Sequence, residues 1–167
     1  VPTGSMEPTI QVGDRVVVDK SAYTLELPFT DVVVAKTGNI NRGDIVIIDS
    51  NAADTRLIKR VVAIEGDKVK LENNVLFING EKATLSVKGH NLYSEQILGQ
   101  TRTIALNPLP SPAKNFNLVT VPRDHVLAMG DNRNNSVDSR YYGFIPIEEI
   151  QGKANAVAFS LDTKNMY

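Results

Sequence analysis

The sequence predicts a mostly β fold built from antiparallel sheets with little helix. Its apolar segments are short, rich in valine and isoleucine, and separated by polar residues, which is typical of strands. Asn73-Asn74 and Asn79-Gly80 indicate tight turns between antiparallel neighbours. At 167 residues, the chain has the length of one compact domain.

The strands follow from these patterns in order along the chain. Valine-rich runs predict the first two, and longer Ile/Val runs on either side of a polar stretch predict the third and fourth. Two short alternating segments then flank Asn73-Asn74, and three more strands lie towards the end. The predicted strands are 14–19, 31–36, 43–48, 56–64, 67–71, 75–79, 117–121, 125–129 and 153–160. A single helical turn is expected at 146–150, because proline opens it and carboxylates follow.

The apolar pattern weakens between 83 and 116, where glycines and prolines interrupt a polar stretch. We interpret 83–116 as a small insertion or extended loop outside the main sheet. Residues 1–82 and 117–167 then form a compact β core.

Composition excludes several classes of function. With 18 basic and 19 acidic residues, the chain has no net field that would attract nucleic acid. It has no cysteine, and its two histidines, His90 and His125, are far apart, so the sequence predicts no metal site and no cofactor. No apolar run approaches the roughly 20 residues that span a bilayer. Serine, lysine, aspartate and glutamate remain for catalysis.

Ser5 lies in the segment Gly4-Ser5-Met6-Glu7-Pro8-Thr9. A serine between a glycine and a nearby proline sits on tight backbone, which suits a nucleophile with an exposed hydroxyl. Taken alone, the segment fits a frayed terminus with turn residues better than a nucleophile.

Lys59 and Arg60 interrupt an apolar strand. Strand alternation places Lys59 on a face with Leu57, Val61 and Ala63, and Arg60 on the other face with Ile58, Val62 and Ile64. Apolar surroundings lower a lysine pKa and so make the neutral, basic form accessible. Two solvated cations on an edge strand are the alternative.

A long polar run extends from Gly130 to Arg140 between apolar segments. Its donors and acceptors are costly to bury unless they meet one another. The opposite charges at Asp131 and Arg133, and at Asp138 and Arg140, favour a loop stabilised by ion pairs within it. A solvated surface loop is the alternative.

In this order, the three segments resemble the type I signal peptidases, membrane-bound serine proteases that use a Ser/Lys dyad. Gly4 to Thr9 is similar to the nucleophile box and Arg42-Gly43-Asp44-Ile45-Val46 to the second box of that family. Lys59-Arg60-Val61-Val62 is similar to the box with the base, and Gly130 to Arg140 to the long polar box.

The resemblance implies that Ser5 is the nucleophile and Lys59 the general base. It implies an oxyanion hole made by the Ser5 amide and the Thr3 hydroxyl. Supporting roles follow for six more residues: Ser136 orients the lysine, Gly130 leaves space beside it, and ion pairs join Arg60 to Asp131 and Asp138 to Arg140.

The resemblance also implies a substrate, the signal peptide of an exported preprotein. Such enzymes cleave after Ala-x-Ala-like sites, and the shallow apolar subsites are expected near Val1, Met6, Ile47 and Ile58. The substrate is expected to lie extended and to add a strand beside the site.

Because the chain begins at Val1, where relatives have a membrane anchor, we expect such an anchor to precede it. The catalytic domain would then lie on the periplasmic (extracytoplasmic) face of the cytoplasmic membrane, with lipid contacted through that anchor. Three alternatives remain: a maturation peptidase of a conjugative-transfer system, a self-cleaving repressor, and a non-catalytic β-sheet binding module.

Overall fold

The computed structural model describes residues 3–23, 25–26, 33–35, 39–108 and 111–160. Its largest sheet has six antiparallel strands in the order β1-β15-β4-β5-β13-β14. These strands are β1 (Asp14–Asp19), β4 (Ile45–Ser50), β5 (Thr55–Ile64), β13 (His125–Met129), β14 (Ile145–Pro146) and β15 (Ile150–Ser160).

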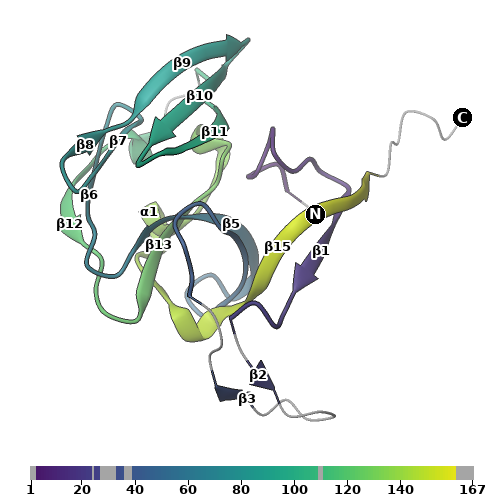
Figure 1. Cartoon of the computed structure of the whole chain (residues 1–167). Coiled ribbons are helices and arrows are strands. Elements are labelled where there is room, and N and C mark those ends of the chain that lie inside the picture. Colours follow the sequence, from purple (N-terminus) through teal and green to yellow (C-terminus); the bar gives the residue numbers. More distant parts are fainter. Residues whose placement is uncertain (1–2, 24, 27–32, 36–38, 109–110, 161–167) are drawn as a thin grey trace, which may run out of the picture.

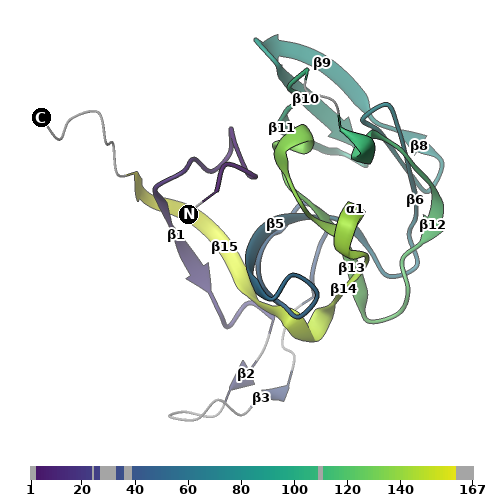
Figure 2. The same ribbon diagram turned by 180° about the vertical axis from the view of Figure 1, so that it is seen from behind.

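Two smaller antiparallel sheets lie on the other side of β5 from β1 and β15 (Figures 1 and 2). One has the order β12-β6-β7-β8 and the other β11-β10-β9. Their strands are β6 (Lys68–Glu72), β7 (Val75–Ile78), β8 (Glu81–Lys82), β9 (Thr84–Gly89), β10 (Leu92–Ile97), β11 (Gln100–Ala105) and β12 (Phe116–Thr120). A short hairpin pairs β2 (Leu25–Glu26) with β3 (Val33–Ala35).

Helical structure is limited to single turns in the described residues. There is one α-helical turn, α1 (Ser139–Tyr142), and there are three 3₁₀ turns: η1 (Pro112–Lys114), η2 (Arg133–Asn135) and η3 (Ile147–Glu149). Both η2 and α1 lie in the polar run that follows β13, so the run is folded rather than extended.

Two apolar cores hold these layers together, and β5 contributes to both. Core 1 packs the four-stranded sheet against β5 and β13 and includes Val62, Leu71 and Met129. Core 2 packs β4, β5 and β13 together and includes Val46, Val61 and Ala128. Because β5 touches both cores, residues near its middle are buried whichever face they occupy.

The prediction of a mostly β, antiparallel fold is confirmed, and the predicted turn at 146–150 is present as η3. The expected strand 31–36 lies partly outside the described residues. The stretch 83–116 holds the three strands β9, β10 and β11, which the sequence did not indicate. The division of the chain into a core and an insertion stays a prediction.

The predicted alternation along β5 is wrong beyond Val62. The pairing of β5 with β13 shifts between Leu127 and Ala128, which leaves Val62 as an extra residue on β5. Val61 therefore faces core 2, whereas Val62 and Ala63 both face core 1. Lys59 lies before the bulge, so its expected face, shared with Leu57 and Val61, is unaffected.

Candidate active site

Ser5 lies in a compact turn rather than at a frayed end. The Glu7 amide donates to the Gly4 carbonyl at 3.1 Å, and the Ile10 amide donates to the Met6 carbonyl at 3.0 Å. Met6 and Ile10 are buried, and Ser5 is itself only 9% exposed. The apolar side chains thus anchor the turn and fix the backbone that carries the Ser5 hydroxyl.

The Thr3 hydroxyl lies beside the Ser5 hydroxyl, with 3.3 Å between Thr3 Oγ1 and Ser5 Oγ. Thr3 is exposed, whereas Ser5 is nearly covered. This places a second hydroxyl donor within reach of any group that approaches Ser5 from solvent.

Three contacts attach the Ser5 turn to the polar run that follows β13. The Asn132 amide donates to the Ser5 carbonyl at 2.9 Å, and Asn132 Nδ2 donates to the Gly4 carbonyl at 3.0 Å. Thr9 Oγ1 donates to Asp131 Oδ2 at 2.6 Å. Neither Thr9 nor Asn132 is predicted from sequence as a site residue, because these contacts span more than 120 residues and have no local signature.

Lys59 projects from β5 and is 3% exposed. It lies directly opposite Val46, so it shares a face with core 2. Lys59 Nζ donates to Ser136 Oγ at 3.1 Å, and Ser136 Oγ donates to Asp138 Oδ2 at 2.7 Å. The lysine is therefore a buried group joined to the polar run, not a solvated cation.

The surroundings of Lys59 lower its pKa and so make the neutral amine more accessible. Burial lowers the pKa of Lys59, the nearby Asp138 carboxylate raises it, and the Arg140 guanidinium lowers it again; the net shift is downward. For Asp138, burial raises the carboxyl pKa, but hydrogen bonds from Arg140, the Gly130 amide and Ser136 outweigh burial and hold the pKa below its ordinary value. A lysine with a lowered pKa thus lies beside a carboxylate that stays ionised.

Gly130 is the point where the Ser5 turn and the lysine network meet. A Cβ built on Gly130 would overlap both Ser136 Oγ and the Ser5 carbonyl oxygen. The space left by the missing Gly130 side chain is therefore filled by these two groups. Within the described part of the chain, Ser5 and Lys59 share no direct hydrogen bond.

The two ion pairs expected from the resemblance are present. Arg60 binds both carboxylate oxygens of Asp131, at 2.9 Å from Nε and 2.8 Å from Nη2, and its Nη1 donates to the Gly43 carbonyl. Arg140 binds Asp138 through Nε and Nη2, each at 2.9 Å. Fork-like pairs of this kind fix orientation as well as distance. The Arg60–Asp131 pair therefore holds β5 against the polar run, whereas the Arg140–Asp138 pair lies within the run.

The residues expected to bind substrate are only partly brought together. Ile47 and Ile58 are direct cross-strand neighbours on β4 and β5. Met6 is 1% exposed, which leaves it little surface for a ligand. Val1 lies outside the described residues.

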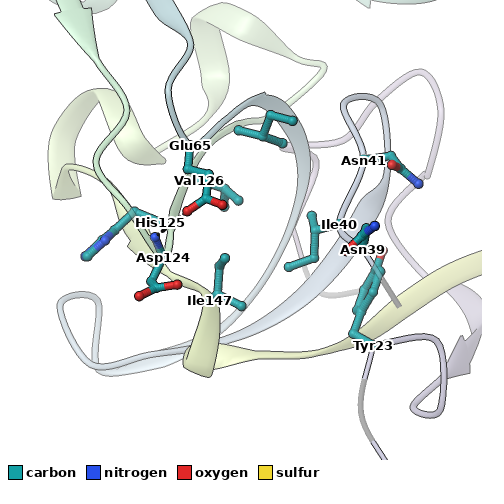
Figure 3. Close-up of a pocket in the computed structure, with 10 residues that line it drawn as sticks. Tyr23, Asn39, Ile40, Asn41, Glu65, Asp124, His125, Val126 and Ile147 are labelled. Carbon is teal, nitrogen blue, oxygen red and sulfur yellow. Dashed lines mark hydrogen bonds between the residues drawn. The ribbon is translucent and has the colours of Figure 1, made fainter. Parts of the chain in front are cut away.

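A cavity of about 500 Å³ opens elsewhere, at the C-terminal end of β5 (Figure 3). Its lining includes Tyr23, Ile40, Glu65, His125 and Ile147, and none of the predicted site residues. In the described ranges, no cluster of three or more His, Asp or Glu side chains is arranged to hold a metal ion. No helix in those ranges has the length and apolarity to cross a membrane.

An antiparallel β fold with a serine on a fixed turn and a buried lysine nearby has the features of a β-sheet serine peptidase. Comparison with known families makes this specific. The family model described as "Signal peptidase, peptidase S26" matches residues 1–159, and the chain therefore belongs to this family. The resemblance drawn from the sequence motifs is confirmed.

Curated relatives agree with this assignment. Signal peptidase I of Pseudomonas aeruginosa is 35% identical, over 96% of this chain and 63% of the relative. Probable signal peptidase I-2 of Synechocystis is 31% identical, over 92% and 59%. Signal peptidase IB of Staphylococcus aureus is 34% identical, over 90% and 71%. The chain thus spans about 63% of the length of the Pseudomonas relative.

A crystal structure of a signal peptidase I from Enterococcus faecalis V583 is also similar. The match has 25% sequence identity and a TM-score of 0.47, and it covers 70% of this chain and 97% of that one.

Proposed function

We propose that this chain is the catalytic part of a signal peptidase that removes signal peptides from exported preproteins after Ala-x-Ala-like sites. In this proposal Ser5 is the nucleophile and Lys59 the general base. The substrate lies extended, with its small side chains near Ile47 and Ile58, and the whole protein is held at the periplasmic face of the cytoplasmic membrane.

The hydrogen bonds of Ser136 carry the proposal. A hydroxyl has one proton, and Ser136 donates it to Asp138, so towards Lys59 it can only accept. One N–H of Lys59 is therefore committed to Ser136. When the amine is neutral, its lone pair is left to take a proton from another group, and the Ser5 turn packs against the same Gly130.

The reaction then follows from these groups. Lys59 Nζ takes the Ser5 proton as Ser5 Oγ attacks the carbonyl carbon before the scissile bond. The Ser5 amide and the Thr3 hydroxyl stabilise the negative charge on the carbonyl oxygen. Lys59 returns the proton to the leaving amine, and the acyl-enzyme forms. Lys59 then takes a proton from water as the water oxygen attacks the ester carbonyl, and it gives that proton to Ser5 Oγ as the ester bond breaks. This releases the signal peptide with a new carboxylate and restores Ser5 and the neutral lysine.

The test is cleavage of a purified preprotein with an Ala-x-Ala site by this chain in detergent. Mass spectrometry should show a single cut after the second alanine. A preprotein with phenylalanine in place of that alanine should resist cleavage, because a shallow pocket excludes large side chains. Efficient cleavage of both preproteins would contradict the proposed specificity, and no cleavage of either would contradict the proposed activity.

The rate of cleavage should depend on pH through Lys59. Because burial lowers its pKa, kcat/KM should rise with pH, with a midpoint below the ordinary lysine value of about 10.4. Initial rates at a series of pH values measure this midpoint. Lys59→Arg, which stays protonated, should be inactive throughout. A profile that is flat between about pH 6 and 9 would count against a lysine base.

Asp138→Asn should change both stability and this pH profile. It leaves Arg140 buried without its charge partner, which should lower the free energy of unfolding by about 3 kcal/mol. Because the Asp138 charge raises the pKa of Lys59, its removal should also move the midpoint of the rate profile to lower pH.

Asp49→Asn is the matched control for that variant. It breaks an exposed carboxylate–arginine pair, with Arg56, and should change stability by less than about 1 kcal/mol. An Asp138→Asn midpoint that moved to higher pH would show that the Asp138 charge does not set the pKa of Lys59.

A further inference from the structure

A buried charge network connects the β9–β11 sheet to the polar run. Glu95 on β10 is fully buried and lies directly opposite Arg102 on β11. Its carboxylate accepts from Arg102 Nε at 2.7 Å and from Arg133 Nη1 and Nη2, each at 2.8 Å. Arg133, in η2, is 1% exposed. One carboxylate therefore holds two guanidinium groups out of water.

The network ends at the backbone of Gly130. Arg133 Nε donates to the Gly130 carbonyl at 3.0 Å, and the Gly130 amide donates to Asp138. The β11 backbone contacts the same run, because the Ala105 amide donates to the Asp131 carbonyl at 2.9 Å. Glu95 is thus two hydrogen bonds away from the residue that packs between Ser5 and Ser136.

A purely structural role is a poor explanation for this arrangement. Buried ion networks cost desolvation, and apolar side chains of similar size stabilise a fold as well or better. This network is also imperfectly satisfied, since Arg102 Nη2 is buried with no hydrogen-bond partner in the described residues. What the charges provide that apolar groups would not is a directed hydrogen bond to the Gly130 carbonyl.

We propose that Glu95 is a positioning residue for the catalytic loop. Through Arg133 it fixes the Gly130 carbonyl, and Gly130 in turn sets the spacing between the Ser5 turn and the Ser136–Lys59 pair. The 83–116 stretch, to which the sequence assigned no function, then contributes to catalysis without touching substrate. This inference rests on the proposed function of Ser5 and Lys59.

The first test is Glu95→Gln, which keeps the shape and removes the charge. It leaves two buried arginines without a carboxylate, and its stability can fall far enough to unfold the chain. The decisive variant is therefore the apolar triple replacement Glu95→Met, Arg102→Leu and Arg133→Met. It removes the network without leaving a buried charge, and we expect it to fold.

In the triple variant kcat should fall roughly 10- to 100-fold while KM changes little, because a displacement near 1 Å at the reacting groups has that effect. Hydrogen exchange of the amides in 130–138 should become faster than in wild type. Glu72→Gln, which breaks an exposed pair with Lys70 on β6, is the control and should change neither quantity.

The outcomes separate this inference from the proposed function. If wild type cleaves the preprotein and the folded triple variant has wild-type kcat, Glu95 has no positioning role. If wild type cleaves nothing, the proposed function fails, and hydrogen exchange alone decides whether the network orders 130–138. Unchanged exchange in the triple variant would overturn the inference in either case.

Discussion

Lys59→Met should lower kcat/KM for preprotein cleavage by about 1,000-fold, the expected effect of removing a general base, and should leave the chain at least as stable as wild type at pH 7. Methionine matches the length of the lysine stem and fits apolar surroundings. The opposite directions of the two effects make this prediction specific to a buried base.

The sign of the stability effect follows from the pKa of Lys59. The folded state holds this pKa below its ordinary value, so below that value the unfolded chain binds a proton more readily than the folded chain. At neutral pH the wild-type lysine therefore destabilises the fold, and methionine removes the penalty. The advantage of Lys59→Met should shrink as the pH rises from the lowered folded-state pKa towards about 10.4, and it should vanish above that value, where both states are neutral.

Denaturant titration and initial rates on the same preparations measure both effects. Lys68→Met, at an exposed lysine on β6, is the matched control and should change neither. Ser5→Ala should lose activity to a similar or greater extent, and the double variant should lose little more, because a nucleophile and its base act as a unit. Activity of Lys59→Met within about threefold of wild type would exclude the lysine as base.

The sequence predicts the residues that carry local patterns and misses those that depend on distant partners. Ser5 was indicated by the glycine and proline around it, and Lys59 and the 130–140 run because each interrupts an apolar pattern. Asn132 and Thr9 were missed as anchors of the Ser5 turn, because their partners lie far away in the chain. Tertiary contacts of this kind leave no periodic signal in one sequence.

The β9–β11 sheet shows why part of the fold was not predicted. Almost every residue of β9 is exposed, so the strand lacks the apolar alternation that reveals a half-buried sheet. On β10 the inward positions include Glu95 as well as Ile97. A carboxylate on the buried face is read from sequence as a solvated residue, and only its two arginine partners make its burial tolerable.

The bulge in β5 shows the same limit at smaller scale. Alternation predicts the face of Lys59 correctly because the strand is regular up to Val61. The extra residue at Val62 follows from how β13 pairs with β5, and the sequence of β5 alone does not contain it. The site survives this error because Lys59 and Arg60 both lie before the bulge.

Gly130→Ala should lower kcat/KM about 100-fold or more, a loss of the size that a displacement near 1 Å produces. A Cβ at this position would lie 2.6 Å from Ser136 Cβ and would overlap Ser136 Oγ and the Ser5 carbonyl oxygen. The Ser5 carbonyl is held by the Asn132 amide. Either Ser136 must rotate away from Lys59, or the Ser5 turn must lift away from the polar run.

The same overlap should lower the free energy of unfolding by about 1–3 kcal/mol, the usual effect of overpacking. Two other glycines separate the possible causes. Gly89→Ala places its Cβ 3.7 Å from the nearest atom and should be close to neutral. Gly80→Ala meets nothing within 4 Å but has a φ of +85°, so it should lose stability without losing kcat.

Initial rates and thermal unfolding of the three variants test this directly. Loss of kcat only in Gly130→Ala would locate the effect in the contact between Ser5 and Ser136 rather than in general strain. A Gly130→Ala chain with wild-type kcat would show that this contact tolerates displacement. Ser136 would then have no part in orienting Lys59, and the directed hydrogen bond from Arg133 to the Gly130 carbonyl would lose its proposed purpose.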